Sequence, residues 1–139
     1  MIALTRCYRF PAAHVLASPD FSAEENDRIY GKCANPAGHG HDYGLEVTVT
    51  GALDPRSGCI ADRDALDALV RERVLARFGH RLLNDDPEFT GPGRVPTAEN
   101  IAAVIHDALA PGIAALGARL LRVRLQETRR NAFVYGDLP

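Results

Sequence analysis

Two of the five histidines in this 139-residue chain, His39 and His41, are separated by a single residue. Because side chains alternate between the two faces of a β-strand, this spacing at the start of a strand places both imidazoles on one face. Two imidazoles on one face allow a single segment to supply two zinc ligands. With five histidines in the chain, the spacing is consistent either with a metal site or with a chance pair.

His14 supplies a third candidate nitrogen. Together, His14, His39 and His41 would leave the fourth position of a zinc ion open, as catalytic zinc sites do; alternatively, His14 is only a polar residue after a strand. Cys33 precedes a turn at residues 35–38, which folds the chain back and brings the thiol near the metal. Cys33 therefore fits either a general base whose pKa a nearby cation lowers, or a buried small apolar residue.

Two more side chains stand where chemistry is possible. His80 follows an expected helix, where it either pairs with Cys33 or is simply favoured by the helix dipole. Glu127 has the parity of the apolar residues Leu121, Val123 and Leu125, so it falls on the apolar side of a strand, where an unpaired charge is costly. Its partner is expected to be the paired N–H donors of an aminopyrimidinone or an arginine, unless the strand end is exposed.

The elements that must position these residues follow from the spacing of apolar side chains. Period-two alternation predicts four strands, at residues 2–10, 45–50, 121–126 and 132–135. Helical spacing predicts one helix from Asp62 to about Gly79 and a second helix capped by Thr97. Pro11 is expected to end the first strand, and Pro111 to kink or divide the second helix. Residues 17–30 are expected to form a long loop with one helical turn.

The order strand, strand, helix, helix, strand, strand indicates an α+β fold with two helices on one face of a four-stranded antiparallel sheet. The length and the lack of a linker or repeat predict one domain over residues 1–139. Four short strands leave two open edges. Joining subunits edge to edge into a closed ring is one way to cover them, so we expect a homo-oligomer.

Composition and charge restrict the partners and the compartment. The formal net charge of −2 gives no reason to expect nucleic acid or an anionic membrane as a partner. No apolar run is long enough to cross a bilayer, and the start of the chain does not resemble an export signal. The three cysteines form no Cys-x-x-Cys pair and are odd in number, which favours a reduced cytoplasm.

Several motifs, in chain order, resemble the family of 6-pyruvoyltetrahydropterin and 6-carboxytetrahydropterin synthases. They are Phe10-Pro11-Ala12-Ala13-His14, Ser22-Ala23-Glu24-Glu25-Asn26, Tyr30-Gly31-Lys32-Cys33 with His39-Gly40-His41-Asp42-Tyr43, Pro96-Thr97-Ala98-Glu99-Asn100, and Gln126-Glu127-Thr128. The resemblance covers nearly the whole chain. Bacterial 6-carboxytetrahydropterin synthases of the queuosine pathway typically carry the cysteine closer to the His-x-His pair. The five residues between Cys33 and His39 therefore favour the pyruvoyl-forming branch.

The resemblance implies a tunnelling fold, in which the sheets of two stacked trimers close into a barrel and active sites lie between subunits. It also implies a zinc ion held by His14, His39 and His41. The substrate would be 7,8-dihydroneopterin triphosphate, whose side-chain hydroxyls bind the metal. No redox cofactor is implied, since the reaction is internal.

The same resemblance implies roles for the remaining residues. Cys33 would remove a side-chain proton, His80 would return or relay protons, and triphosphate would leave by elimination. Glu127 would anchor the pterin ring, with Thr97 nearby. The carboxy-forming lyase, which releases acetaldehyde as well, is the alternative enzyme within the family.

One position departs from the family pattern. Gly79 stands directly before His80, where the family usually has an aspartate. Without that carboxylate the imidazole loses a partner that fixes its tautomer and supports its charged form. Asp85 or Asp86 in the following loop is a candidate substitute. A pterin-binding protein without catalytic activity is therefore the alternative to an enzyme.

Overall fold

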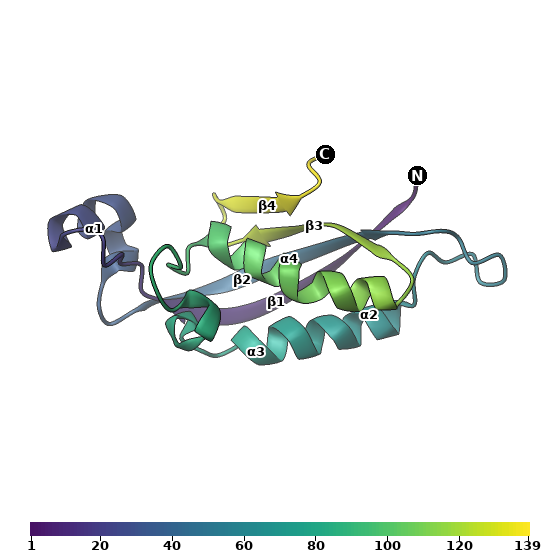
Figure 1. Cartoon of the computed structure of the whole chain (residues 1–139), viewed down its shortest axis with the longest axis horizontal. Helices are drawn as coiled ribbons and strands as arrows, with labels where there is room; N and C mark the ends of the chain where they lie inside the picture. Colours follow the sequence, from purple (N-terminus) through teal and green to yellow (C-terminus); the bar gives the residue numbers. More distant parts are fainter.

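A four-stranded antiparallel sheet with the order β1-β2-β3-β4 runs along the molecule (Figure 1). A computed structural model describes all of residues 1–139. The sheet consists of β1 (Ala3–His14), β2 (His39–Thr50), β3 (Arg119–Gln126) and β4 (Ala132–Gly136). The four predicted strands and their antiparallel arrangement are confirmed. β1 and β4 are the two edge strands.

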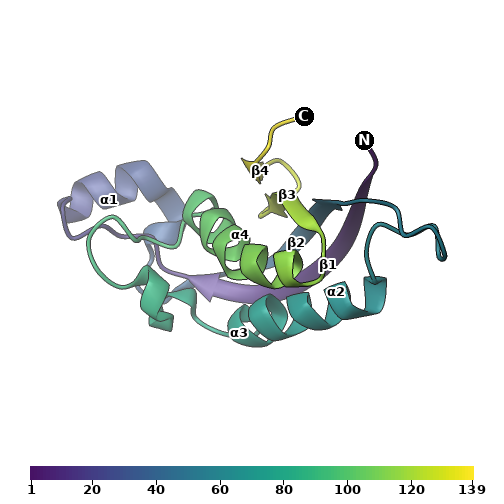
Figure 2. The ribbon, with the colours of Figure 1, turned by 45° about the vertical axis from the view of Figure 1, so that its right-hand side comes forward.

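Two long helical segments cover one face of this sheet (Figure 2). The first comprises α2 (Arg63–Val70), one π-helical turn (Arg71–Leu75) and α3 (Ala76–Phe78), and the second is α4 (Ala98–Ala115). The predicted caps are present, since the Asp62 side chain accepts hydrogen bonds at the start of α2 and Thr97 accepts one from the Asn100 amide. The expectation of two helices on one face is confirmed.

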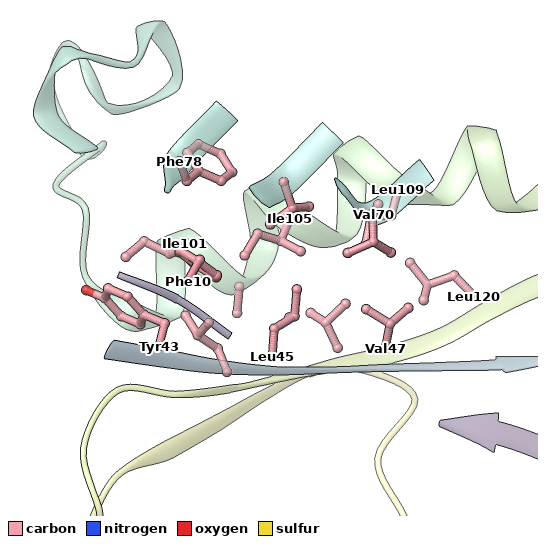
Figure 3. Packing of buried hydrophobic residues seen from close by; sticks show 14 of the residues in the cluster. Phe10, Tyr43, Leu45, Val47, Val70, Phe78, Ile101, Ile105, Leu109 and Leu120 are labelled. Atoms are coloured by element: carbon pink, nitrogen blue, oxygen red, sulfur yellow. The ribbon is translucent and has the colours of Figure 1, made fainter. Parts of the chain in front are cut away.

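The core lies between the helices and the sheet (Figure 3). Leu45 and Val47 of β2 face Ile101 and Ile105 of α4, and all four are almost wholly buried. Tyr43 lies on the same face, because odd-numbered residues of β2 alternate with outward-facing ones. The same alternation continues to His41 and His39 at the start of β2, so both imidazoles lie on the face of the strand that carries Tyr43.

The expectation that Pro11 ends the first strand is wrong, because β1 continues to His14. The reason is its place at the sheet edge. The Pro11 carbonyl accepts a hydrogen bond from the His80 amide at 2.6 Å, so this residue directs its backbone groups away from β2. A proline there removes no hydrogen bond from the ladder. The strand thus extends far enough to bring His14 opposite His39.

Two other local expectations are also corrected. Residues 17–30 contain the two-turn helix α1 (Ala23–Tyr30) rather than one helical turn, and a reciprocal capping box between Ser22 and Glu25 starts it. Helix α4 continues through Pro111 to Ala115, so of the two outcomes expected for this proline, a kink or a division, the division is wrong. Leu109 and Ile113, on either side of the proline, are fully buried, and their packing holds the segment in the helix.

The remaining helical pieces are three short 3-10 turns, at Gly31–Ala34, Leu83–Asp85 and Pro87–Phe89. The first of them follows α1, which stands apart from the sheet at one end of the molecule (Figure 1). No helix of the chain is both long enough and apolar enough to cross a membrane.

Candidate active site

Two imidazoles meet at the end of the sheet, where β1 finishes and β2 begins. His14 pairs with His39 and Ala12 with His41 in the register of the two strands. The Nε2 atoms of His14 and His41 lie 3.1 Å apart. Two nitrogens that each bind a tetrahedral zinc at about 2.0–2.1 Å are roughly 3.3 Å from one another. The pair therefore has the spacing that one shared ion requires.

The protonation of His14 is also suited to a metal. Its Nδ1 lies 2.9 Å from the carbonyl oxygen of Pro96. Because a carbonyl oxygen only accepts, Nδ1 carries the hydrogen and the neutral ring presents a lone pair at Nε2. Burial lowers the pKa of His14, and burial together with the neighbouring histidines lowers that of His41 to about 4. Both rings are therefore neutral near pH 7, which is the form that binds metal ions.

Cys33 completes a compact group. It lies in the 3-10 turn after α1, and the ligand atoms of His14, Cys33 and His41 are all within 4.8 Å of one another. Burial raises the pKa of the Cys33 thiol, and the carboxylate of Glu127 raises it further. This direction is opposite to the lowered pKa of a general base, because the surrounding protein groups supply burial and negative charge. The position next to the imidazoles agrees with the sequence prediction.

Glu127 enters the same group from β3. It follows the last residue of that strand, and one of its oxygens lies 3.7 Å from His14 Nε2 and 3.6 Å from His41 Nε2. Its side chain is only 13% exposed, and none of the ion pairs in the structure joins it to an arginine. Burial, followed by the charge of Glu99, raises the pKa of Glu127. Neither the arginine pair nor the exposed strand end considered from the sequence is present.

His39 and Thr97 border this group. The His39 ring centre lies 4.6 Å from that of His41, but His39 is exposed and its nitrogens lie outside the compact group. Thr97 begins α4 directly after Pro96, whose carbonyl reaches His14. The structure thus brings His14, Cys33, His41 and Glu127 together and places the other two beside them.

His80 lies outside this compact group. It is exposed, follows α3 with a φ of 59°, and donates its amide hydrogen to Pro11 on the outer edge of β1. A cavity of about 510 Å³ is lined by His80 and by residues of β1 and β2 that include His41. The two suggested carboxylate substitutes are not equivalent. Both oxygens of Asp86 accept hydrogen bonds from Arg77 at 2.7 Å, whereas Asp85 is exposed.

Two contacts at His14 were missed by reasoning from the sequence. The Tyr43 hydroxyl lies 3.3 Å from His14 Nδ1, beside the Pro96 carbonyl described above. Tyr43 offered a signal, since it shares the parity of His39 and His41 and so falls on their face of the strand. Pro96 offered none, because every residue carries a carbonyl group.

Comparison with known proteins agrees with this geometry. The family model described as 6-pyruvoyl tetrahydropterin synthase matches residues 3–137. The 6-pyruvoyl tetrahydrobiopterin synthase of Poecilia reticulata is 41% identical over 134 residues, which cover 95% of this chain and 88% of that protein. The 6-carboxy-5,6,7,8-tetrahydropterin synthase of Bacillus subtilis (strain 168) is 35% identical over 71 residues, which cover 50% of this chain and 46% of that protein.

Similarity in three dimensions extends over the whole chain. The structure of Caenorhabditis elegans 6-pyruvoyl tetrahydropterin synthase aligns with a TM-score of 0.86 and 34% sequence identity, and the alignment covers 99% of this chain and 96% of that chain. Sequence, fold and the grouping of imidazole, thiol and carboxylate side chains therefore agree: the chain belongs to the 6-pyruvoyl tetrahydropterin synthase family.

Proposed function

We propose that this chain is a lyase that converts 7,8-dihydroneopterin triphosphate to 6-pyruvoyltetrahydropterin by eliminating triphosphate. The observation that carries the proposal is the meeting of His14, Cys33, His41 and Glu127 at one end of the sheet. Relatives named as pyruvoyl-forming synthases match almost the entire chain, whereas the carboxy-forming synthase of Bacillus subtilis matches about half of it. This difference supports the pyruvoyl-forming reaction over the carboxy-forming one.

Zinc is the proposed metal, with His14, His39 and His41 as its ligands. The 3.1 Å spacing of the His14 and His41 nitrogens supports two of these ligands. His39 is exposed beside His41, so a rotation of its ring toward the centre meets little resistance from packing. Three imidazoles leave the fourth position for substrate, whereas the additional bond to Cys33 would close the site.

The remaining side chains act on the substrate. When bound, zinc supplies a Lewis acid that polarises the substrate hydroxyls and a positive charge that favours a thiolate nearby. Cys33, next to the two imidazoles, takes the side-chain proton as general base. Glu127 accepts hydrogen bonds from the two adjacent N–H donors of the pterin ring, and Thr97 borders the ring. The small exposed fraction of Glu127 supports this role, because a carboxylate in a nearly dry site needs such donors.

We also propose that the active form is a homohexamer of two stacked trimers in the cytoplasm. The open edges of β1 and β4 support an assembly through strand pairing. His80 is exposed on the outer edge of β1, where it is available to an active site that a neighbouring subunit completes. In that position His80 relays protons to the substrate.

The decisive experiment incubates the zinc-loaded protein with 7,8-dihydroneopterin triphosphate and follows triphosphate and acetaldehyde together. We expect triphosphate without acetaldehyde. Cys33→Ala should slow its release by about 10²–10⁴-fold, the usual contribution of a general base. The matched control is Cys59→Ala, which alters an exposed cysteine and should leave the rate unchanged.

The other outcomes are equally informative. Release of acetaldehyde with triphosphate would assign the chain to the carboxy-forming reaction instead. Tight binding of the pterin without either product would refute the lyase proposal and identify a pterin-binding protein in which Gly79 has disabled the proton relay.

A further inference from the structure

The segment from Val95 to Asn100 is a turn held from both ends. The Val95 carbonyl accepts hydrogen bonds from the Asn100 side-chain amide at 2.7 Å and from the Thr97 backbone amide at 2.8 Å. The Thr97 hydroxyl in turn accepts from the Asn100 backbone amide at 3.3 Å. Pro96 lies inside this closed turn. Its carbonyl therefore has a fixed direction, which is toward His14 Nδ1 at 2.9 Å.

Tyr43 reaches the same nitrogen from the sheet. Its side chain is fully buried, and its ring stacks on Phe10 with the ring centres 5.2 Å apart, so the hydroxyl has little freedom to move. The hydroxyl oxygen lies 3.3 Å from His14 Nδ1. Since the single Nδ1 hydrogen already points at the Pro96 carbonyl, the hydroxyl is a second acceptor beside it. A tyrosine hydroxyl can also donate, so it fits either tautomer and serves to steady the ring, whereas the Pro96 carbonyl, which only accepts, disfavours the tautomer that lacks this hydrogen.

His41 has no comparable support. Its only ring hydrogen bond joins its Nε2 to the Nε2 of His14. Because His14 Nε2 carries the lone pair, the hydrogen of that bond belongs to His41 when no ion lies between the rings. The two imidazoles therefore differ. The His14 ring already directs its Nε2 lone pair toward the proposed metal site. The His41 ring must move its hydrogen from Nε2 to Nδ1 before it can bind a metal ion through Nε2.

We propose that the Val95–Asn100 turn and the Tyr43 hydroxyl are positioning groups that fix His14 as the preorganised ligand of the metal centre. Asn100 acts through Val95 and Pro96, and these three residues are not among the proposed ligands of the metal or the substrate, whereas Thr97 of the same turn borders the pterin ring. The part of this inference that concerns metal affinity rests on the proposed function, whereas the tautomer of His14 does not. Outer partners of metal-binding histidines typically change metal affinity by about 10–100-fold when they are removed.

Asn100→Ala is the sharpest variant for a test. It removes the side-chain amide that holds Val95 but keeps the backbone amide that Thr97 caps, and alanine is a good helix former. Tyr43→Phe removes only the hydroxyl and keeps the ring against Phe10. The matched control is Asn26→Ala, because the Asn26 amide also bonds the backbone of a loop, at Ser18, without contacting His14.

The first measurement is the tautomer of His14 in the metal-free protein, from nitrogen-15 shifts of the ring at a pH where it is neutral. We expect a single Nδ1–H tautomer in the wild type, in Asn26→Ala and in Tyr43→Phe, which keeps the Pro96 carbonyl, and a mixture in Asn100→Ala. An Nε2–H tautomer in the wild type would overturn the inference. So would an unchanged single tautomer in Asn100→Ala. If that variant does not fold, Asn100→Asp, which keeps the size of the side chain but lacks the donor to Val95, decides the question.

The second measurement is zinc affinity by competition with a chelator, with the melting temperature recorded for each variant. We expect about 10–100-fold weaker binding in Asn100→Ala and Tyr43→Phe, and wild-type binding in Asn26→Ala. Lower melting temperatures with unchanged zinc affinity would show a purely structural role and overturn the positioning role. A wild type that binds no zinc would refute the zinc proposal, and the tautomer measurement would still decide the protonation of His14.

Discussion

Gly79→Ala should destabilise the fold, although alanine is usually the more stabilising residue. Gly79 has φ −62° and ψ 133°, which any residue adopts, so the exchange would normally stabilise by about 0.4–1 kcal/mol by restricting the unfolded chain. Here, an added Cβ would lie 2.5 Å from the Leu75 carbonyl oxygen, whereas ordinary van der Waals contact begins at 3.4 Å. That oxygen also accepts the Gly79 amide hydrogen at 3.0 Å, so it cannot move away without loss of the bond.

The size of the effect follows from this overlap. The backbone must shift by up to 0.9 Å, the difference between 3.4 and 2.5 Å, to make room for the methyl group. Forcing an extra methyl group into a packed site costs about 1–3 kcal/mol, and the entropic gain of about 0.4–1 kcal/mol offsets part of it, which leaves a net loss of about 1.3 kcal/mol at the middle of both ranges. For a chain of this length, the melting temperature should fall by roughly 3–8 °C.

Urea denaturation at one fixed protein concentration is the appropriate assay, because the proposed homohexamer would make the unfolding midpoint depend on concentration. Gly44→Ala is the matched control, since the nearest neighbour of a Cβ there is 3.6 Å away, an ordinary contact. We expect the control to unfold at or above the wild-type midpoint and Gly79→Ala to unfold below it. A Gly79→Ala midpoint equal to or above that of the wild type, with the same slope, would refute the steric argument.

Three further predictions concern acid, the core and the metal. A hydrogen bond from Arg77 lowers the pKa of Asp86 in the folded protein. The ionised Asp86 carboxylate therefore stabilises the fold fully above its ordinary pKa of 3.8, and this stabilisation is lost as the pH falls through the lowered folded-state pKa. In Asp86→Asn, the urea midpoint should therefore fall less steeply below about pH 4 than it does in the wild type. The same dependence of the midpoint on pH in both proteins would contradict this. Ile105→Ala, at a fully buried position, should lower the free energy of unfolding by about 2–5 kcal/mol in the same assay; a loss below about 1 kcal/mol would mean that the helix face is not packed as described. At a free zinc concentration 100 times its Kd, bound zinc should stabilise the protein by about 2.7 kcal/mol, so removal of the zinc with a chelator should lower the melting temperature. An equal fall on chelation of His14→Ala would argue against zinc at this site.

Much of the fold was predictable because the relevant signals are local. Asp62 and Thr97 cap helices as their side-chain chemistry indicates, and period-two alternation located all four strands. The errors arose where the surroundings outweigh the local rule. Pro11 is tolerated because β1 is an edge strand, and Pro111 does not divide its helix because buried neighbours hold the segment together. Neither the strand order nor the packing is visible at the proline itself.

The site was predictable only where a strand carries it. Parity along β2 places His39 and His41 on one face, and parity along β3 directs Glu127 to the apolar side, where it lies near the imidazoles. The approach of His14 to His41 depends on the register between β1 and β2, which follows from pairing of distant segments. The Pro96 carbonyl reaches His14 because of the turn that holds it, and no particular residue type in the sequence indicates this contact.

Gly79 is part of the turn that places His80, so an aspartate cannot simply be introduced there. His80 has a φ of 59°, which is uncommon for residues other than glycine, and its amide bond to Pro11 at 2.6 Å holds the turn against β1. A side chain at position 79 would displace the backbone next to that bond. The orientation of His80 thus comes from the backbone rather than from a preceding carboxylate. Gly79→Asp should therefore lower stability and leave triphosphate release no faster than in the wild type, and a higher kcat in this variant would contradict the argument.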